Sequence, residues 1–242
     1  SLQNSPSVSW RVSITFSLMV ISQVGLSHMF VPFYITVTLA GIIAAIIISR
    51  IPPLSRKPDT YIDGSSKKGD VDLIPEGYTT FSWGLYNALN KAEENASVKK
   101  ILLDGFKNVL DMWIGVLPVV MAMGGIAVMI AEYTTFFQLL GMPFIPLLEL
   151  LRIPEAVQAS QTLVVGFADM FIPSVLASSI ESEITRFIIA ATSVTQLIYM
   201  SEVGGLLLGS KIPVNLKDLI IIFIQRTLVT LPIITLIANI IF

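Results

Sequence analysis

The sequence predicts an all-α fold, that of a polytopic membrane protein with broken or re-entrant helices, and three observations lead to this fold class. Hydrophobic residues make up 54% of the 242 residues and charged residues only 13%, which is about half the charged share of an average soluble domain. Several apolar segments approach the roughly 20 residues that a helix needs to cross a bilayer. The later segments are interrupted by Gly and Pro, which is typical of transporter-like architectures.

The first fifty residues (1–50) are expected to form a transmembrane hairpin. Residues 10–27 and 29–49 are both apolar, and almost nothing separates them, so the two helices should run tightly antiparallel. The second segment ends before the helix-breaking pair Pro52–Pro53.

Polar residues follow, and residues 51–97 are expected to form a cytoplasmic loop rich in Pro, Gly, Ser and charges. Nine of the 15 Lys and Arg residues lie within residues 50–107, and such an excess is typical of cytoplasmic loops. Residues 98–111 carry apolar side chains on one helical face and charged ones on the other. This pattern predicts an amphipathic helix on the membrane surface, with a solvated helix packed on its own domain as the alternative.

The region from residue 112 to residue 242 is almost continuously apolar but repeatedly interrupted. It divides into five segments, namely 112–131, 134–151, 156–180, 185–208 and 217–242. Gly166 and Pro173 cut the third segment, and Gly204 and Gly205 cut the fourth. Interrupted segments of this kind indicate discontinuous helices around a transport site.

Two of these interrupted segments carry polar residues along one helical face. The first polar stripe contains Gln158, Gln161, Thr162 and Asp169, and the second contains Thr192, Thr195, Gln196, Tyr199 and Glu202. Each stripe ends in a carboxylate just before or at a break. A carboxylate facing lipid is costly, and backbone groups freed by a break are tolerated only in a cavity or inside protein. We therefore predict that both stripes border one polar cleft, which binds a small molecule or an ion.

Other interpretations of these polar residues stay open. Asp169 could cap a half-helix that begins at Met170, and Glu202 could lie at the membrane interface. Hydroxyl groups in membrane helices often only hold helices together. Arg226 lies deep in the last segment and is expected to need an acidic partner, for which Asp169 and Glu202 are the candidates.

Three stretches, "MAMGGIAVMIAEYTTFFQLLGMPFIPLLELLRIPEA", "VVGFADMFIPSVL" and "SVTQLIYMSEVGGLLLGSKIPV", resemble the YjiH family of bacterial inner-membrane proteins, grouped by the Gate or nucleoside-recognition domain. The resemblance covers about residues 10–242 and is strongest over residues 112–213. It implies a multi-pass protein of the bacterial cell (inner) membrane, with a Gate-type membrane domain over residues 112–242 and an inverted pair of broken-helix units. A nucleoside-like or ion substrate, and a homo-oligomer or a paired Gate-domain subunit, are the partners that this resemblance implies, besides the lipid bilayer.

Other function classes find little support. The "GFAD" stretch departs from the G-x-G-D motif of intramembrane aspartyl proteases, because Ala168 replaces the second Gly. The chain has no Cys and one His, so a zinc centre lacks ligands, and a net charge of −2 offers no basic surface for nucleic acid. We expect no enzymatic activity, no metal, no cofactor and no nucleic-acid partner. A secondary transporter or solute-recognition protein is preferred, with a non-transporting membrane subunit or scaffold as the alternative.

Overall fold

The computed structural model describes residues 6–57, 79–94, 98–111, 133–209 and 212–242, and between them residues 113–114, 118, 121–122, 125–126 and 129–130. All regular elements in these residues are helical, so the all-α fold class is confirmed for the described part of the chain. The chain divides into two units, one formed by Ser1–Lys57 with Val120–Phe242 and the other by Pro58–Val119. The span predicted at residues 112–131 lies largely outside the described residues.

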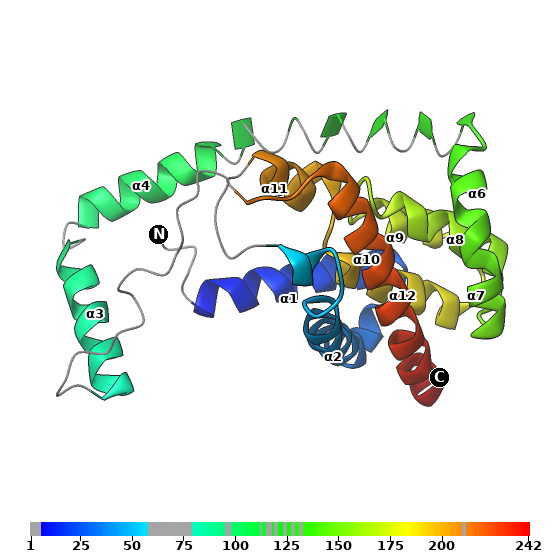
Figure 1. The fold of residues 1–242 in the computed structure, drawn as a ribbon, viewed down its shortest axis with the longest axis horizontal. Helices are drawn as coiled ribbons and strands as arrows, with labels where there is room; N and C mark the ends of the chain where they lie inside the picture. Colours follow the sequence, from blue (N-terminus) through cyan, green and yellow to red (C-terminus); the bar gives the residue numbers. More distant parts are fainter. Residues whose placement is uncertain are drawn as a thin grey trace. The chain divides into compact units, whose positions relative to one another are not determined.

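The first unit is a bundle of helices (Figure 1). Its α-helices are α1 (Pro6–Gln23), α2 (Phe30–Ile48), α6 (Phe136–Gly141), α7 (Ile145–Leu150), α8 (Ala156–Val165), α9 (Ile172–Ala177), α10 (Glu183–Gln196), α11 (Gly205–Gly209) and α12 (Leu216–Ile241). Short 3-10 turns occur at Ser27–Met29, Leu54–Arg56 and Met142–Phe144, and a π-helical turn, η6, occupies Met200–Gly204.

The middle of the first unit is α10, which packs against α1, α2, α8, α9 and α12. Its side chains from Phe187 to Ser193 are all buried. Phe187 meets Phe33 of α2 and Phe242 at the end of α12, with ring centroids 5.6 Å apart in both pairs. A helix that is apolar or small all round is expected to be surrounded by others, and α10 has that position.

α1 and α2 are joined through a turn at Gly25, whose φ of +78° suits a residue without a side chain. α1 runs across the view in Figure 1 while α2 is seen nearly end-on, so the two helices cross instead of running antiparallel as predicted. α2 packs mainly against α12 and α10. Ala40 and Ala44 are fully buried on α2, and such small side chains allow other helices to approach closely.

Two helices of the first unit are long and apolar enough to cross a membrane. They cover Ser27–Ile48, with a mean hydropathy of 2.4, and Leu216–Ile241, with 2.1. Only 33% and 44% of their apolar windows are buried, although a core helix of a soluble protein is buried on most sides. The exposed face of α2 carries Val31, Ile35, Leu39, Ile42 and Ile46. Two shorter apolar stretches are also described, Ile14–Gln23 within α1 and Phe136–Leu150 across α6 and α7. Complete spans at the other predicted segments stay a prediction.

The second unit contains two described helices, α3 (Thr80–Glu94) and α4 (Val98–Asp111). The sequence predicts a loop or linker for residues 51–97, and α3 shows that Thr80–Glu94 is helical instead. Phe81, Leu85 and Leu89 recur every four residues along α3, which is the spacing of one helical face. Residues 58–78, which are rich in Pro and Gly, give the whole region the composition of a loop.

Apolar side chains of α4 are exposed, namely Leu102, Leu103, Phe106, Val109 and Leu110. All of them except Leu103 belong to the apolar face that the sequence predicts. That this face lies on a membrane surface stays a prediction.

Candidate functional site

The third apolar segment is interrupted where the sequence predicts it. α8 ends at Val165, and α9 begins at Ile172 with Pro173 in its first turn. Gly166 follows α8 directly, and a Cβ atom there would lie 2.2 Å from Oε1 of Gln196. Gly166 is therefore needed for the close approach of α10, and Pro173 suits the start of α9 because its φ is already helical.

The fourth segment is interrupted earlier than the sequence predicts. α10 ends at Gln196, Leu197 adopts a left-handed φ of +60°, and helical structure resumes with η6. Gly204 and Gly205, the predicted breakers, lie inside helical turns at the junction of η6 and α11. Glu202 therefore follows the break, and its side chain lies outside what the structure describes.

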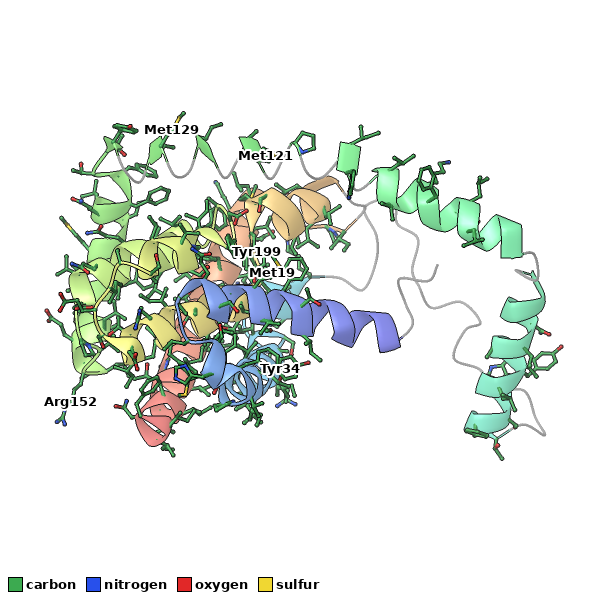
Figure 2. The ribbon with its side chains drawn as sticks, turned by 180° about the vertical axis from the view of Figure 1, so that it is seen from behind. Met19, Tyr34, Met121, Met129, Arg152 and Tyr199 are labelled. Atoms are coloured by element: carbon green, nitrogen blue, oxygen red, sulfur yellow. The ribbon has the colours of Figure 1, made fainter. Side chains whose placement is uncertain are left out.

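Side chains satisfy the carbonyl groups at the open end of α10. The hydroxyl of Tyr199, which Figure 2 shows inside the bundle, donates to the carbonyls of Ser193 and Val194 at 3.1 and 2.8 Å. Nε of Arg226, from α12, donates to the carbonyl of Thr195 at 2.9 Å. The last carbonyls of a helix lack partners within it. α10 can end inside the bundle because Tyr199 and Arg226 supply those partners.

The two breaks are hydrogen-bonded to each other. The backbone N–H groups of Met200 and Ser201 donate to the carbonyls of Phe167 and Ala168, at 2.9 and 3.1 Å. Polar backbone groups that one break frees are thus satisfied by the other, as an apolar environment requires. We call this region the break junction, and it comprises residues 163–169, 195–201 and 226–227.

Gln196 links three helices within the break junction. Its Nε2 donates to the carbonyl of Leu163 on α8 at 3.1 Å and to Oγ1 of Thr227 on α12 at 2.9 Å. Gln196 is fully buried, so these bonds satisfy both of its N–H donors. The sequence predicts Gln196 as a substrate-binding residue, and its contacts make it a residue that holds the junction together.

Asp169 belongs to the break junction and stabilises the turn before α9. Its side chain is 7% exposed, and Oδ1 accepts a hydrogen bond from the backbone N–H of Phe171 at 2.7 Å. An Asp side chain that binds the backbone two residues on is a common turn motif. This bond belongs to the turn before α9 and not to a helix cap, because α9 has Phe171 at its N-cap and no side-chain cap there.

A cavity of about 230 Å³ lies between α6, α8 and α9. Its lining residues are Phe137, Gln138, Gln158, Gln161, Thr162, Val165, Leu176, Ser179 and Ile180. Gln158, Gln161 and Thr162 belong to the first predicted stripe. Gln138 and Ser179 are absent from the prediction, because they lie on other segments whose approach to α8 a single sequence does not reveal. We call this cavity the glutamine cavity.

The glutamine cavity is polar through neutral groups alone, since none of its lining residues is an acid or a base. The carboxamides of Gln138, Gln158 and Gln161 form no hydrogen bond within the described part of the chain. Each carboxamide offers two donors and an acceptor. The hydroxyl of Thr162 donates to the carbonyl of Ala159 at 2.7 Å, so its lone pairs stay available as acceptors. The cavity therefore presents unused donors and acceptors of hydrogen bonds.

The structure does not bring all predicted residues into one cleft. Gln161 lines the glutamine cavity, whereas Gln196 binds Leu163 in the break junction. The two regions meet at Val165, which lines the glutamine cavity and also belongs to the break junction, but Gln161 and Gln196 have no hydrogen-bond partner in common among the described residues. The hydroxyl of Thr195 donates to the carbonyls of Ala191 and of Thr192 in its own helix, at 3.0 Å each, which agrees with a role in packing.

Asp169 is not the acidic partner expected for Arg226. The hydrogen bond given to Asp169 comes from Phe171, and no described carboxylate pairs with Arg226. In the described residues no group of three or more His, Asp or Glu side chains could hold a metal ion.

The chain is similar to an uncharacterized protein of Alkalihalophilus pseudofirmus. The two are 59% identical over 230 residues, which are 95% of this chain and 50% of the relative. The chain therefore spans about half the length of the curated relative that it matches. No family model matches the chain, and no solved structure matches it.

Proposed function

We propose that this chain forms a multi-pass membrane protein that binds a small, neutral, polar solute in the glutamine cavity. Membrane insertion is supported by the two helices of spanning length and by their exposed apolar faces. In water these faces would leave many large hydrophobic side chains exposed, whereas lipid tails would cover them in a bilayer. The excess of Lys and Arg within residues 50–107 supports the cytoplasmic side for that region.

The observation that carries solute binding is the set of three unpaired carboxamides around one cavity. Gln138, Gln158 and Gln161 would be costly if they faced lipid without a partner, so we expect them to meet water or a solute. Carboxamides donate and accept hydrogen bonds without carrying charge. They suit a solute that also does both, such as a nucleobase or a sugar. A cation would instead need converging carboxylate or carbonyl oxygens, which favours the nucleoside-like substrate over the ion.

The break junction favours transport over recognition alone. Interrupted helices surround the substrate site in many secondary transporters, because the helix ends and free backbone groups at each break can bind the substrate or its coupling ion. The resemblance to the YjiH family and its Gate domain points in the same direction. A non-transporting subunit or scaffold of a larger complex is the alternative, and it requires no solute in the cavity.

Thermal unfolding of the detergent-purified chain tests solute binding. Uridine and adenosine are the probes, and sodium chloride at equal concentration is the ionic comparison. A ligand that binds the folded state raises the Tm by mass action, so we expect a rise with at least one nucleoside. Gln161→Ala should abolish that rise, whereas Gln23→Ala, which removes an exposed carboxamide outside the cavity, should retain it. A wild-type response in the Gln161→Ala variant, or no response to either nucleoside, would refute this function and favour the scaffold.

The orientation is tested separately by single Cys residues, since the chain has none of its own. We expect a Cys at Ser66 to be protected from an impermeant thiol reagent in intact cells, and a Cys at His28 to be labelled. Labelling of the Cys at Ser66 would reverse the proposed orientation.

A further inference from the structure

Arg226 lies near the middle of α12, about 15 Å from Leu216 at the rise of an α-helix. Its side chain is only 8% exposed. The guanidinium is therefore inside the bundle, in a helix whose mean hydropathy is 2.1. A charge in such a place needs a specific compensation.

The hydrogen bonds of Arg226 are incomplete. Nε donates to the carbonyl of Thr195, but Nη2 is buried and has no partner. No described carboxylate forms an ion pair with it. Arg186, on α10, is a useful comparison. It also has a buried nitrogen without a partner, Nε, but a carboxylate is near, since Nη2 lies 3.5 Å from Oε1 of Glu183.

The end of α10 compensates part of the charge. The carbonyl end of a helix carries roughly half a negative charge, and Nε of Arg226 lies against it. About half of the positive charge then remains without a counter-charge inside the bundle. Arg does not lose its proton in proteins, so neutralisation must come from another negative group.

Further buried polar atoms without partners lie in or beside the break junction. Oγ of Ser201 and Oε1 of Gln196 belong to the junction, and Oγ1 of Thr192 lies one turn before the end of α10. A hydroxyl can turn its proton toward an incoming acceptor. Unsatisfied buried polar groups are rare in folded proteins and call for an explanation.

We infer that Arg226 is the centre of an anion-binding site that takes a carboxylate or phosphate group. A planar guanidinium matches the two oxygens of such a group, and Nη2 is the donor left for it, with the hydroxyl of Ser201 as a second donor from the same junction. The oxyanion supplies the counter-charge that the described part of the chain lacks. Neither Arg226 nor Ser201 lines the glutamine cavity, so the site does not depend on the proposed function.

The test is the thermal stability of the detergent-purified chain in sodium phosphate and in sodium acetate, against sodium chloride of equal ionic strength. At a hundredfold excess over its Kd, an oxyanion should raise the Tm by roughly 5–10 °C. Arg226→Met should abolish the rise, and Arg226→Lys, which lacks the planar fork, should weaken it. Arg186→Met should keep it.

Three results would overturn the inference. One is an unchanged Tm of the wild-type chain in both oxyanions, which would leave Glu202 as the candidate counter-charge. Another is an equal response in the Arg226→Met variant, and a third is a loss of response in Arg186→Met. If Arg226→Met does not fold, Arg226→Lys provides the test. A Lys variant that binds phosphate as tightly as the wild type would contradict a site built on the planar guanidinium.

A second titration in micelles that contain phosphatidylglycerol distinguishes the source of the oxyanion. A phosphate response that persists assigns the site to a soluble anion. If the lipid raises the Tm of the wild type but not that of Arg226→Met, and phosphate then adds no further rise, the site belongs to a lipid headgroup.

Discussion

Among Gly→Ala substitutions at the described glycines of the first unit, Gly166→Ala is expected to disrupt the break junction most. The new Cβ would lie 2.2 Å from Oε1 and 3.3 Å from Cδ of Gln196, and 3.1 Å from the carbonyl oxygen of Leu163. A Cβ cannot share that space, so the Gln196 side chain has to leave. When it leaves, it loses its hydrogen bonds to Leu163 and Thr227.

The size of the effect follows from these two bonds. Each buried hydrogen bond contributes about 1 kcal/mol, and a buried group left without its partner costs about 1–3 kcal/mol more. Replacing Gly by Ala recovers about 0.4–1 kcal/mol through the stiffer unfolded chain. We therefore expect a net loss of about 2–5 kcal/mol in the free energy of unfolding, or roughly 4–20 °C in Tm for a chain of this size.

Circular dichroism of the detergent-purified variants on heating measures the change in Tm. Gly41→Ala in α2 is the matched control, because a Cβ there meets nothing within 4 Å, and it should be neutral or stabilise by up to about 1 kcal/mol. In a Gln196→Ala background, Gly166→Ala should cost almost nothing, since the clash is already gone. If Gly166→Ala behaves like Gly41→Ala, or if its cost persists without Gln196, the close packing of the junction is wrong.

Three further predictions concern the same unit. Tyr199→Phe removes the hydroxyl proton that is shared between two carbonyls of α10. It should lower the free energy of unfolding by about 1–3 kcal/mol relative to Tyr34→Phe. Equal Tm values in both variants would count against this contact. Leu197→Gly should stabilise the chain by up to about 1 kcal/mol. The left-handed conformation costs a bulky residue about 1–2 kcal/mol, and part of the relief is lost because Gly makes the unfolded chain more flexible. A clear fall in Tm would contradict a strained Leu197. Lys57→Met breaks the 2.6 Å ion pair with Asp218. Because both partners are partly exposed, the free energy of unfolding should fall by less than about 1 kcal/mol, and the difference should vanish in high salt. A difference that salt does not change would point to another role for Lys57.

Sequence patterns predict best where one residue type decides the local structure. Pro173 marks the first break because it fixes its own φ, and the apolar runs of α2 and α12 are evident from composition. Gly166 is evident as a possible break residue, but its contact with Gln196 is not. The second break has no such marker. α10 ends at Gln196 because Tyr199 and Arg226 supply donors to its last carbonyls, and those contacts exist only in the folded bundle.

The candidate site shows the same division. Helical spacing correctly groups Gln158, Gln161 and Thr162, which all lie on α8 and line one cavity. It fails for Asp169, because the spacing is extended through a helix that stops at Val165. Gln138 comes from another helix, and no periodicity within α8 can reveal it.

The hydrogen bonds between the two breaks also constrain how the chain is made. The carbonyls of Phe167 and Ala168 leave the ribosome before their donors, the N–H groups of Met200 and Ser201. In the bilayer proposed for this chain, each unpaired backbone group costs several kcal/mol. The segment with the first break should therefore stay in the translocon, or in the hydrated membrane interface, until the segment with the second break has been synthesised. The two interrupted helices are then expected to enter the bilayer together. A chain truncated between them should leave the segment with the first break uninserted.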